Sequence, residues 1–154
     1  MDKPRFIVEA EKFLAGEKLA NYLAFSDFLK DNKASKSATS QPTSQYSGWS
    51  VRYKKRTICH FRAWHDFWYV SFFKNVDVNL YEPFLTVEMR NFILDNIATE
   101  LPCGGCSGNS DRVILGRKFD IVCGCHLLRL NNPSCEMLER AKELVLLTKA
   151  VVES

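Results

Sequence analysis

The stretch Trp49–Lys74, WSVRYKKRTICHFRAWHDFWYVSFFK, decides the fold. Three successive segments of this stretch show a pattern that repeats every two residues. They are rich in β-branched and aromatic residues. A period of two built from such residues is typical of β-strands. Turns are expected at Lys54–Arg56 and Trp64–Phe67. Connections this short make neighbouring strands antiparallel, so the stretch predicts a three-stranded antiparallel meander.

The chain before the meander carries a helical pattern. Apolar residues at spacings of three and four predict a helix over Phe6–Asp31. Gly16 is expected to divide it into two helices, because glycine costs about 1 kcal/mol inside a helix. Residues 32–48 hold five serines, two threonines and two glutamines. That composition predicts an exposed and mobile polar loop.

Two further helices are expected after the meander. Thr86 is a suitable N-cap for a helix from Val87 to about Glu100. Asn132-Pro133 is a start signal for a last helix, with asparagine as the cap and proline at the first helical position. Two short strands are expected between these helices, at 112–115 and 119–122. Helices at both ends of a central meander predict an α+β domain.

Length and composition limit the possible classes of protein. The chain has 154 residues, of which 46% are hydrophobic. These values fit one domain over residues 1–154, with a core that needs no disulfide bonds. The net charge of +3 is too small to indicate nucleic-acid binding by itself. No signal core and no apolar run near the ~18 residues of a membrane span is visible, so a cytoplasmic protein is expected.

Cysteine and glycine crowd two short motifs, Cys103-Gly104-Gly105-Cys106 and Cys123-Gly124-Cys125-His126. In a reducing compartment, clustered thiols indicate metal binding or reactivity more than a disulfide framework. Structural zinc requires four thiolate or imidazole ligands, and two close pairs supply them. The pattern therefore predicts a zinc site at Cys103, Cys106, Cys123 and Cys125, with His126 as an alternative to Cys125.

Other interpretations of the cysteines remain open at this point. The thiols are also compatible with small buried residues in a Gly-rich connection, where cysteine behaves as a hydrophobe. A redox pair at Cys103 and Cys106 is disfavoured, because such a pair is expected at the start of a helix after a strand. Cys135 lies in the first turn of the predicted last helix, where the helix dipole favours a thiolate. It is therefore a candidate reactive thiol, with a histidine as its base.

Aromatic and basic residues crowd the predicted meander. One face must pack on helices, and aromatic side chains left on the other face predict a ligand-binding wall or a stacking platform. The candidate ligand-binding residues are Trp49, Tyr53, His60, Trp64 and Trp68. A small-molecule pocket between the sheet and the helices is the favoured form of such a site. Nucleic acid is disfavoured as a partner, because the net charge is low and no RNA-recognition signature appears.

Several segments resemble a group of small uncharacterised bacterial proteins. They are WSVRYK at 49–54, the turn Cys103–Cys106, LGRKFD at 115–120, Cys123 and Asn132-Pro133. The resemblance covers most of the chain from about Glu17 onward. It implies a compact cytoplasmic α+β domain with a recurring use of the Cys-rich segment. It implies neither an activity nor a zinc site, and it assigns no catalytic residue.

Three hypotheses about function follow from these patterns. The first is a non-enzymatic ligand-binding or sensing domain whose C-terminal third is fastened by zinc. The second is a thiol-dependent enzyme or redox sensor that uses Cys135, or Cys103 with Cys106. The third is an interaction module for protein or nucleic acid. The expected partner is an unknown small molecule or a protein, and no membrane association is expected.

Overall fold

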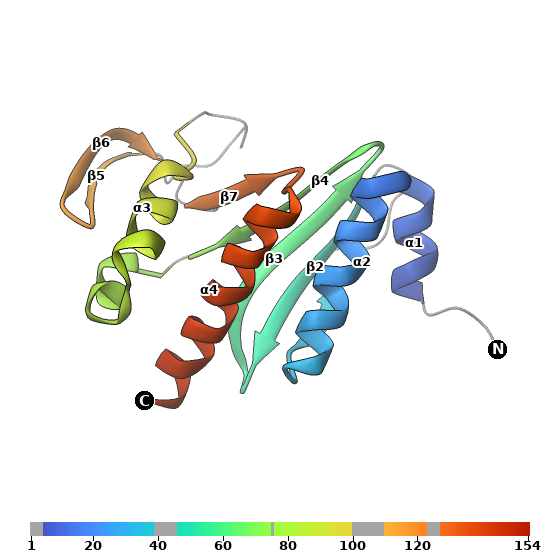
Figure 1. Cartoon of the computed structure of the whole chain (residues 1–154), viewed down its shortest axis with the longest axis horizontal. Helices are drawn as coiled ribbons and strands as arrows, with labels where there is room; N and C mark the ends of the chain where they lie inside the picture. Colours follow the sequence, from blue (N-terminus) through green and yellow to red (C-terminus); the bar gives the residue numbers. More distant parts are fainter. Residues whose placement is uncertain (1–4, 39–45, 75, 100–109, 123–126) are drawn as a thin grey trace. The chain divides into compact units, whose positions relative to one another are not determined.

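A computed structural model describes residues 5–38, 46–74, 76–99, 110–122 and 127–154 (Figure 1). Its elements in chain order are α1 (Arg5–Phe13), α2 (Gly16–Asp31), β1 (Ser35–Ala38), β2 (Tyr46–Tyr53), β3 (Arg56–Trp64), β4 (Phe67–Phe72), the 3-10 helix η1 (Val78–Phe84), α3 (Val87–Asp95), β5 (Ser110–Ile114), β6 (Arg117–Val122), β7 (Leu128–Asn131) and α4 (Cys135–Glu153). The predicted α+β class is confirmed. Within the described ranges, none of the helices combines the length and the apolar character that a membrane span requires.

The chain divides into two compact units. The first comprises Met1–Val70 and Leu130–Ser154, and the second comprises Ser71–Arg129. The expectation of a single domain over 1–154 stays a prediction. The predicted division of the N-terminal helix is confirmed, because α1 ends at Phe13 and α2 begins at Gly16.

The strands form two sheets, one with the order β1-β2-β3-β4-β7 and one that pairs β5 with β6. The predicted meander is confirmed as β2, β3 and β4, with a further strand on each side. Two-residue turns at Lys54-Lys55 and His65-Asp66 join its strands. Lys54 and Lys55 have positive φ values of 49° and 68°. Two left-handed residues in a row are what a type I′ hairpin turn requires.

Part of the segment 32–48, predicted to be a polar loop, forms strands. Ser35–Ala38 forms β1, which pairs antiparallel with β2, and β2 already begins at Tyr46. An edge strand hydrogen-bonds a neighbour on one side only, and edges often carry polar residues. β1 is such an edge strand, and its serine-rich sequence does not alternate between apolar and polar residues. A strand could therefore not be predicted from it. Residues 39–45 lie outside the described part of the chain.

Helices α1, α2 and α4 cover one face of the strands of the first unit (Figure 1). α1 contacts β2 and β3, α4 contacts β3, and α2 contacts both of the other helices. Phe25, Phe61 and Trp68 are among the fully buried side chains between these layers. Burying one side chain of this size stabilises the fold by about 1.5–3 kcal/mol. The inner face of α4 consists of buried residues, which are Leu138, Ala141, Leu144, Val145 and Thr148.

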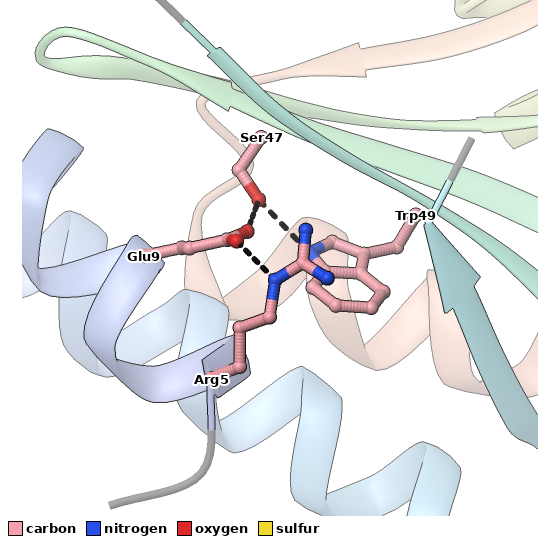
Figure 2. Close-up of polar contacts among 4 residues, drawn as sticks. All are labelled: Arg5, Glu9, Ser47 and Trp49. Carbon is pink, nitrogen blue, oxygen red and sulfur yellow. Dashed lines mark hydrogen bonds and ion pairs between the residues drawn. The ribbon is translucent and has the colours of Figure 1, made fainter. Parts of the chain in front are cut away.

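Buried polar contacts tie α1 to β2 (Figure 2). The Ser47 hydroxyl donates to Glu9 Oε2 at 2.5 Å and accepts from Trp49 Nε1 at 3.1 Å. Arg5 Nε donates to the other Glu9 oxygen at 2.6 Å. Burial acts to raise the pKa of Glu9, but the hydrogen bonds from Ser47 and Arg5 outweigh it and lower the pKa below its ordinary value. The fold thus holds an ionised carboxylate almost out of contact with water.

The last helix starts after Ser134, and the predicted cap at Asn132 is wrong. The Ser134 hydroxyl accepts from Met137 N at 3.2 Å, which makes it the N-cap. Asn132 has a φ of 43° and pairs with Trp68 instead. Its backbone N donates to Trp68 O at 2.7 Å, and its Oδ1 accepts from Trp68 N at 3.0 Å. Asparagine tolerates left-handed backbone, so it suits this turn between β7 and α4.

In the second unit, α3 begins as predicted. The Thr86 hydroxyl accepts from Met89 N at 3.1 Å and caps the helix. The helix ends at Asp95, earlier than the predicted end near Glu100. The stretch before it contains η1. The two strands expected at 112–115 and 119–122 are present as β5 and β6, joined at Leu115-Gly116.

Side chains from η1 and α3 hold the β5–β6 hairpin in this unit. The Asn79 carboxamide donates to Val113 O at 3.3 Å and accepts from Leu115 N at 2.8 Å. One side chain therefore satisfies a backbone acceptor and a backbone donor at the end of β5. Arg90 on α3 donates to the carbonyl oxygen of Leu115. These contacts fix the hairpin against η1 and α3, and they shape the space between η1 and β5.

Candidate functional site

The second unit contains a cavity of about 430 Å³. Its apolar lining consists of Val76, Val78, Val113, Ile114 and Leu127. Its polar lining consists of Asp77, Asn79 and Arg112. This volume is within the usual range for small-molecule sites, which combine apolar walls with a few placed polar groups.

The N-terminus of η1 positions two of the polar residues. Asp77 is the N-cap, and its Oδ1 accepts from Asn79 N at 3.0 Å. Both polar groups of the Asn79 side chain are used by the β5 end of the hairpin. Asn79 therefore builds the cavity wall, while Asp77 keeps its second carboxylate oxygen without a partner among the described residues.

Arg112 on β5 brings a positive charge to the same cavity. The side chain is exposed, and within the described ranges its guanidinium makes no hydrogen bond or ion pair. Guanidinium stays protonated at every ordinary pH. Asp77 and Arg112 thus line one cavity with opposite charges and form no ion pair with each other.

A second candidate site is the face of the first unit's strands opposite α1, α2 and α4, which we call the outer face. Successive side chains of a strand point to opposite faces of the sheet, and residues directly opposite each other on neighbouring strands point to the same face. Register places on it Ser35, Ser37, Ser50, Arg52, Thr57 and His60. Its other end carries Arg62, Trp64, Phe67 and Tyr69. Two of the predicted ligand-binding residues, His60 and Trp64, are therefore on the same face.

Trp64 is the centre of an aromatic cluster on the outer face. Its ring centroid lies 5.5 Å from that of Phe67 and 5.3 Å from that of Tyr69. The Arg62 guanidinium carbon lies 5.7 Å from the Trp64 ring centroid, within the range of a cation–π interaction. Tyr69 is buried, whereas Trp64 and Phe67 are half-buried. The indole of Trp64 therefore keeps accessible surface at a site where the surrounding rings hold it in place.

The other predicted ligand-binding residues take different places. Trp49 and Trp68 belong to the core, where Trp49 packs on Phe6 with 5.4 Å between ring centroids and Trp68 packs on Tyr22 with 5.0 Å. Tyr53 lies at the end of β2, and its hydroxyl donates to Glu153 of α4. The structure therefore does not bring these three residues together with His60 and Trp64.

Most of the predicted cysteine site lies outside the described residues. This holds for all five predicted zinc ligands, Cys103, Cys106, Cys123, Cys125 and His126. Among the described residues, no three His, Cys, Asp or Glu side chains gather as a metal site would require.

Cys135, the candidate reactive thiol, is the exposed first residue of α4, and its Sγ donates to Asn21 Oδ1 at 3.3 Å. The thiol of Cys59 is buried in the core, and burial raises its pKa.

The residues of the cavity were not predicted as site residues. Asp77 followed by an apolar residue and Asn79 is a signal for a capped turn, since aspartate is a preferred N-cap. That signal places η1, but it does not indicate a binding site. The proximity of Asp77 and Arg112 arises only when the β5–β6 hairpin folds back on η1.

No family model, no curated protein and no solved structure matches this chain. Membership in the bacterial group that the sequence resembles therefore stays a prediction.

Proposed function

We propose that this chain is a non-enzymatic ligand-binding domain, and that its ligand is a small zwitterion of the free amino-acid class. The observation that carries the proposal is the presence of opposite charges at Asp77 and Arg112 in one cavity, where neither forms an ion pair with another described residue. A carboxylate on the ligand fits Arg112, because guanidinium binds carboxylates through two parallel hydrogen bonds. An ammonium group fits Asp77.

The apolar lining supports a ligand with an apolar side chain. Three of the apolar lining residues are each about 2% exposed and belong to the buried core, namely Val78, Ile114 and Leu127. Val113 is 59% exposed and offers apolar surface that a bound side chain would cover. Covering such surface is favourable by about 25 cal/mol for each Å².

The composition of the cavity also supports binding without catalysis. Among the described residues, those that line it include no cysteine, serine, histidine or lysine. Nucleophilic catalysis uses such side chains together with a base within hydrogen-bond reach. The predicted zinc site, which lies outside the described residues, remains part of the proposal as a structural element.

Isothermal titration calorimetry with the free amino acids tests this function. We expect heat of binding from apolar amino acids, and a loss of about tenfold or more in affinity with Asp77→Asn or Arg112→Gln, because each removes one charged hydrogen-bonding partner. The matched controls are Asp95→Asn and Arg117→Gln. These two exposed residues of the same unit pair with each other at 3.9 Å and do not line the cavity. Absence of binding for all amino acids, or equal losses in the control variants, would contradict the proposal.

A further inference from the structure

The outer face carries a second inference, which does not depend on the cavity. We propose that this face binds single-stranded nucleic acid, with a base stacked at Trp64 and phosphates held by arginine and lysine. The described residues support it through the aromatic cluster, the local charge, the exposed hydroxyls and the conformation of the β2–β3 turn.

The aromatic cluster provides a stacking surface. Trp64 is half-buried and is held by Phe67 and Tyr69 at tilts of 49° and 39°. Sheet faces with fixed aromatic rings bind unpaired bases, because every base presents a flat π-face. A duplex does not present its bases in this way, so the geometry favours a single strand. Arg62 beside the Trp64 ring adds a cation next to the stacking position.

The charged side chains that register places on the outer face are all positive. They include Arg52 and Arg62, and none of the described residues of this face is Asp or Glu. Lys55 and Arg56 add positive charge at the turn between β2 and β3, whereas the Lys54 ammonium lies toward α4. Glu153 of α4 pairs with Lys54 at 3.6 Å, and both side chains are largely exposed, so the pair offsets little of the field.

Exposed hydroxyls complete the polar part of the surface. Ser35 lies opposite Arg52, and Ser37 lies opposite Ser50, so the serines of β1 continue the basic row. Serine hydroxyls and arginines are common donors to phosphate oxygens. An acidic residue in this row would repel a phosphate. The serine and arginine side chains of the row instead carry hydrogen-bond donors that a phosphate could accept from.

The β2–β3 turn holds its lysines at a conformational cost. Lys54 and Lys55 have φ values of 49° and 68°, a region that favours asparagine and glycine. Residues held in a costly conformation are a ground for assigning them a function. The turn places the backbone of Lys55 beside Arg52, whose guanidinium donates to Lys55 O at 3.0 Å, while Lys54 Nζ lies 3.6 Å from Glu153 Oε1 of α4.

Fluorescence anisotropy with a labelled thymidine homopolymer of about 15 nucleotides tests the inference. The assay uses the full chain at about 50 mM salt, where phosphate contacts are strongest. Trp64→Leu is expected to weaken binding about tenfold, as removal of one stacking position predicts. Phe84→Leu is the control, because Phe84 is an exposed aromatic residue of the second unit, 52% accessible.

The double variant Lys54→Asn with Lys55→Gly separates binding from folding. We expect its thermal midpoint to rise, because both residues suit a type I′ turn. We expect its binding to weaken and the slope of log K against log salt to fall by about 0.7 for each phosphate that the variant no longer neutralises. A more stable protein that binds less well cannot be explained by misfolding.

Three results would overturn the inference. The first is no binding of the unmodified protein to the oligonucleotide at low salt. The second is full binding by Trp64→Leu. The third is equal competition by polyglutamate, which carries charge without bases and would identify an acidic protein segment as the partner.

Discussion

The hydroxyl of Ser47 donates a 2.5 Å hydrogen bond to the carboxylate of Glu9, 38 positions earlier in the chain. Both residues are buried, at 3% and 8% exposure. The contact fixes the first helix of the chain to a central strand. Because a buried carboxylate requires its donors, removal of this hydroxyl is expected to cost more than removal of the hydroxyl of a surface serine.

Ser47→Ala is expected to lower the free energy of unfolding by about 1.5–3 kcal/mol, the usual contribution of a hydrogen bond to a charged group. Urea unfolding followed by tryptophan fluorescence measures it. The matched control is Ser37→Ala, an exposed serine of β1, for which a change within about 0.5 kcal/mol is expected. Equal effects of the two substitutions would show that the Glu9 contact does not stabilise the fold.

The lowered pKa of Glu9 also predicts a dependence of stability on pH. The pKa is lower in the folded chain than its ordinary value of 4.5. Its contribution is therefore fully present above the unfolded pKa and is lost as pH falls through the folded pKa. In unfolding experiments between about pH 6 and pH 3, Glu9→Gln is expected to flatten this loss. Glu17→Gln, at an exposed position of α2, serves as the control for loss of one carboxylate from the surface.

Asn132 and Ser134 are expected to respond differently to substitution. Ser134→Ala removes the N-cap of α4 and should cost about 1 kcal/mol. Asn132→Ala should cost more, because it leaves Trp68 N without its acceptor and places alanine at a φ of 43°. Asn132→Gly relieves only the backbone strain, so its cost should lie below that of Asn132→Ala. Chemical denaturation of the three variants gives this order, and an unchanged stability for Asn132→Ala would refute the assigned role.

Tyr53 and Glu153 form a titrating pair at the end of β2. The hydrogen bond to Glu153 raises the pKa of Tyr53, and the same bond lowers the pKa of Glu153. Glu153→Gln should therefore let Tyr53 ionise at lower pH, since a neutral amide no longer opposes the phenolate. Ultraviolet difference titration measures phenolate formation, and subtraction of the Tyr53→Phe curve isolates this residue. An unshifted curve in Glu153→Gln would rule out the pairing in solution.

The two thiols in the described residues should differ in accessibility. Cys135 is exposed and Cys59 is 1% exposed in the core, where burial raises its pKa. Iodoacetamide is expected to alkylate Cys135 in the native protein and to reach Cys59 only after unfolding, because the thiolate is the reacting form. Mass spectrometry of proteolytic fragments identifies the modified residue. Rapid native labelling of Cys59 would mean that the core opens readily.

The zinc hypothesis predicts a metal content. Native mass spectrometry of protein purified without chelator should show one zinc ion per chain, and Cys123→Ser should lose it, since structural sites need all four ligands. A mass equal to the bare chain, with all six cysteines open to thiol titration, would exclude zinc.

The alternation over 49–74 was enough to predict the strands of the meander, but not the faces of its tryptophans. Side chains that pack on the helices are odd-numbered on β3, such as Phe61, and even-numbered on β4, such as Trp68, and both of these contact Tyr22 of α2. The two-residue turn at His65-Asp66 causes this reversal. Trp64 and Trp68 therefore have opposite environments despite their spacing of four, and the sequence contains no signal that decides which face the helices cover.

Other features depend on contacts between distant residues. The edge strand β1 forms because β2 offers it a partner, and its serine-rich sequence would suit a loop equally well. Asn132 resembles a helix cap in sequence, but its side chain accepts a hydrogen bond from the backbone N of Trp68 instead. The cavity needs Asp77 and Arg112 from separate elements, so neither residue indicates a site by itself.

The Asn79 side chain gives the hairpin of the second unit protection against self-association. Its carboxamide occupies the Val113 carbonyl and the Leu115 amide, which are groups that a strand from another molecule would need for pairing. Val113 itself is an exposed β-branched residue, the kind that promotes such pairing. Asn79 therefore occupies the two backbone groups that an incoming strand would use at the end of β5, and its removal is expected to promote self-association at this edge.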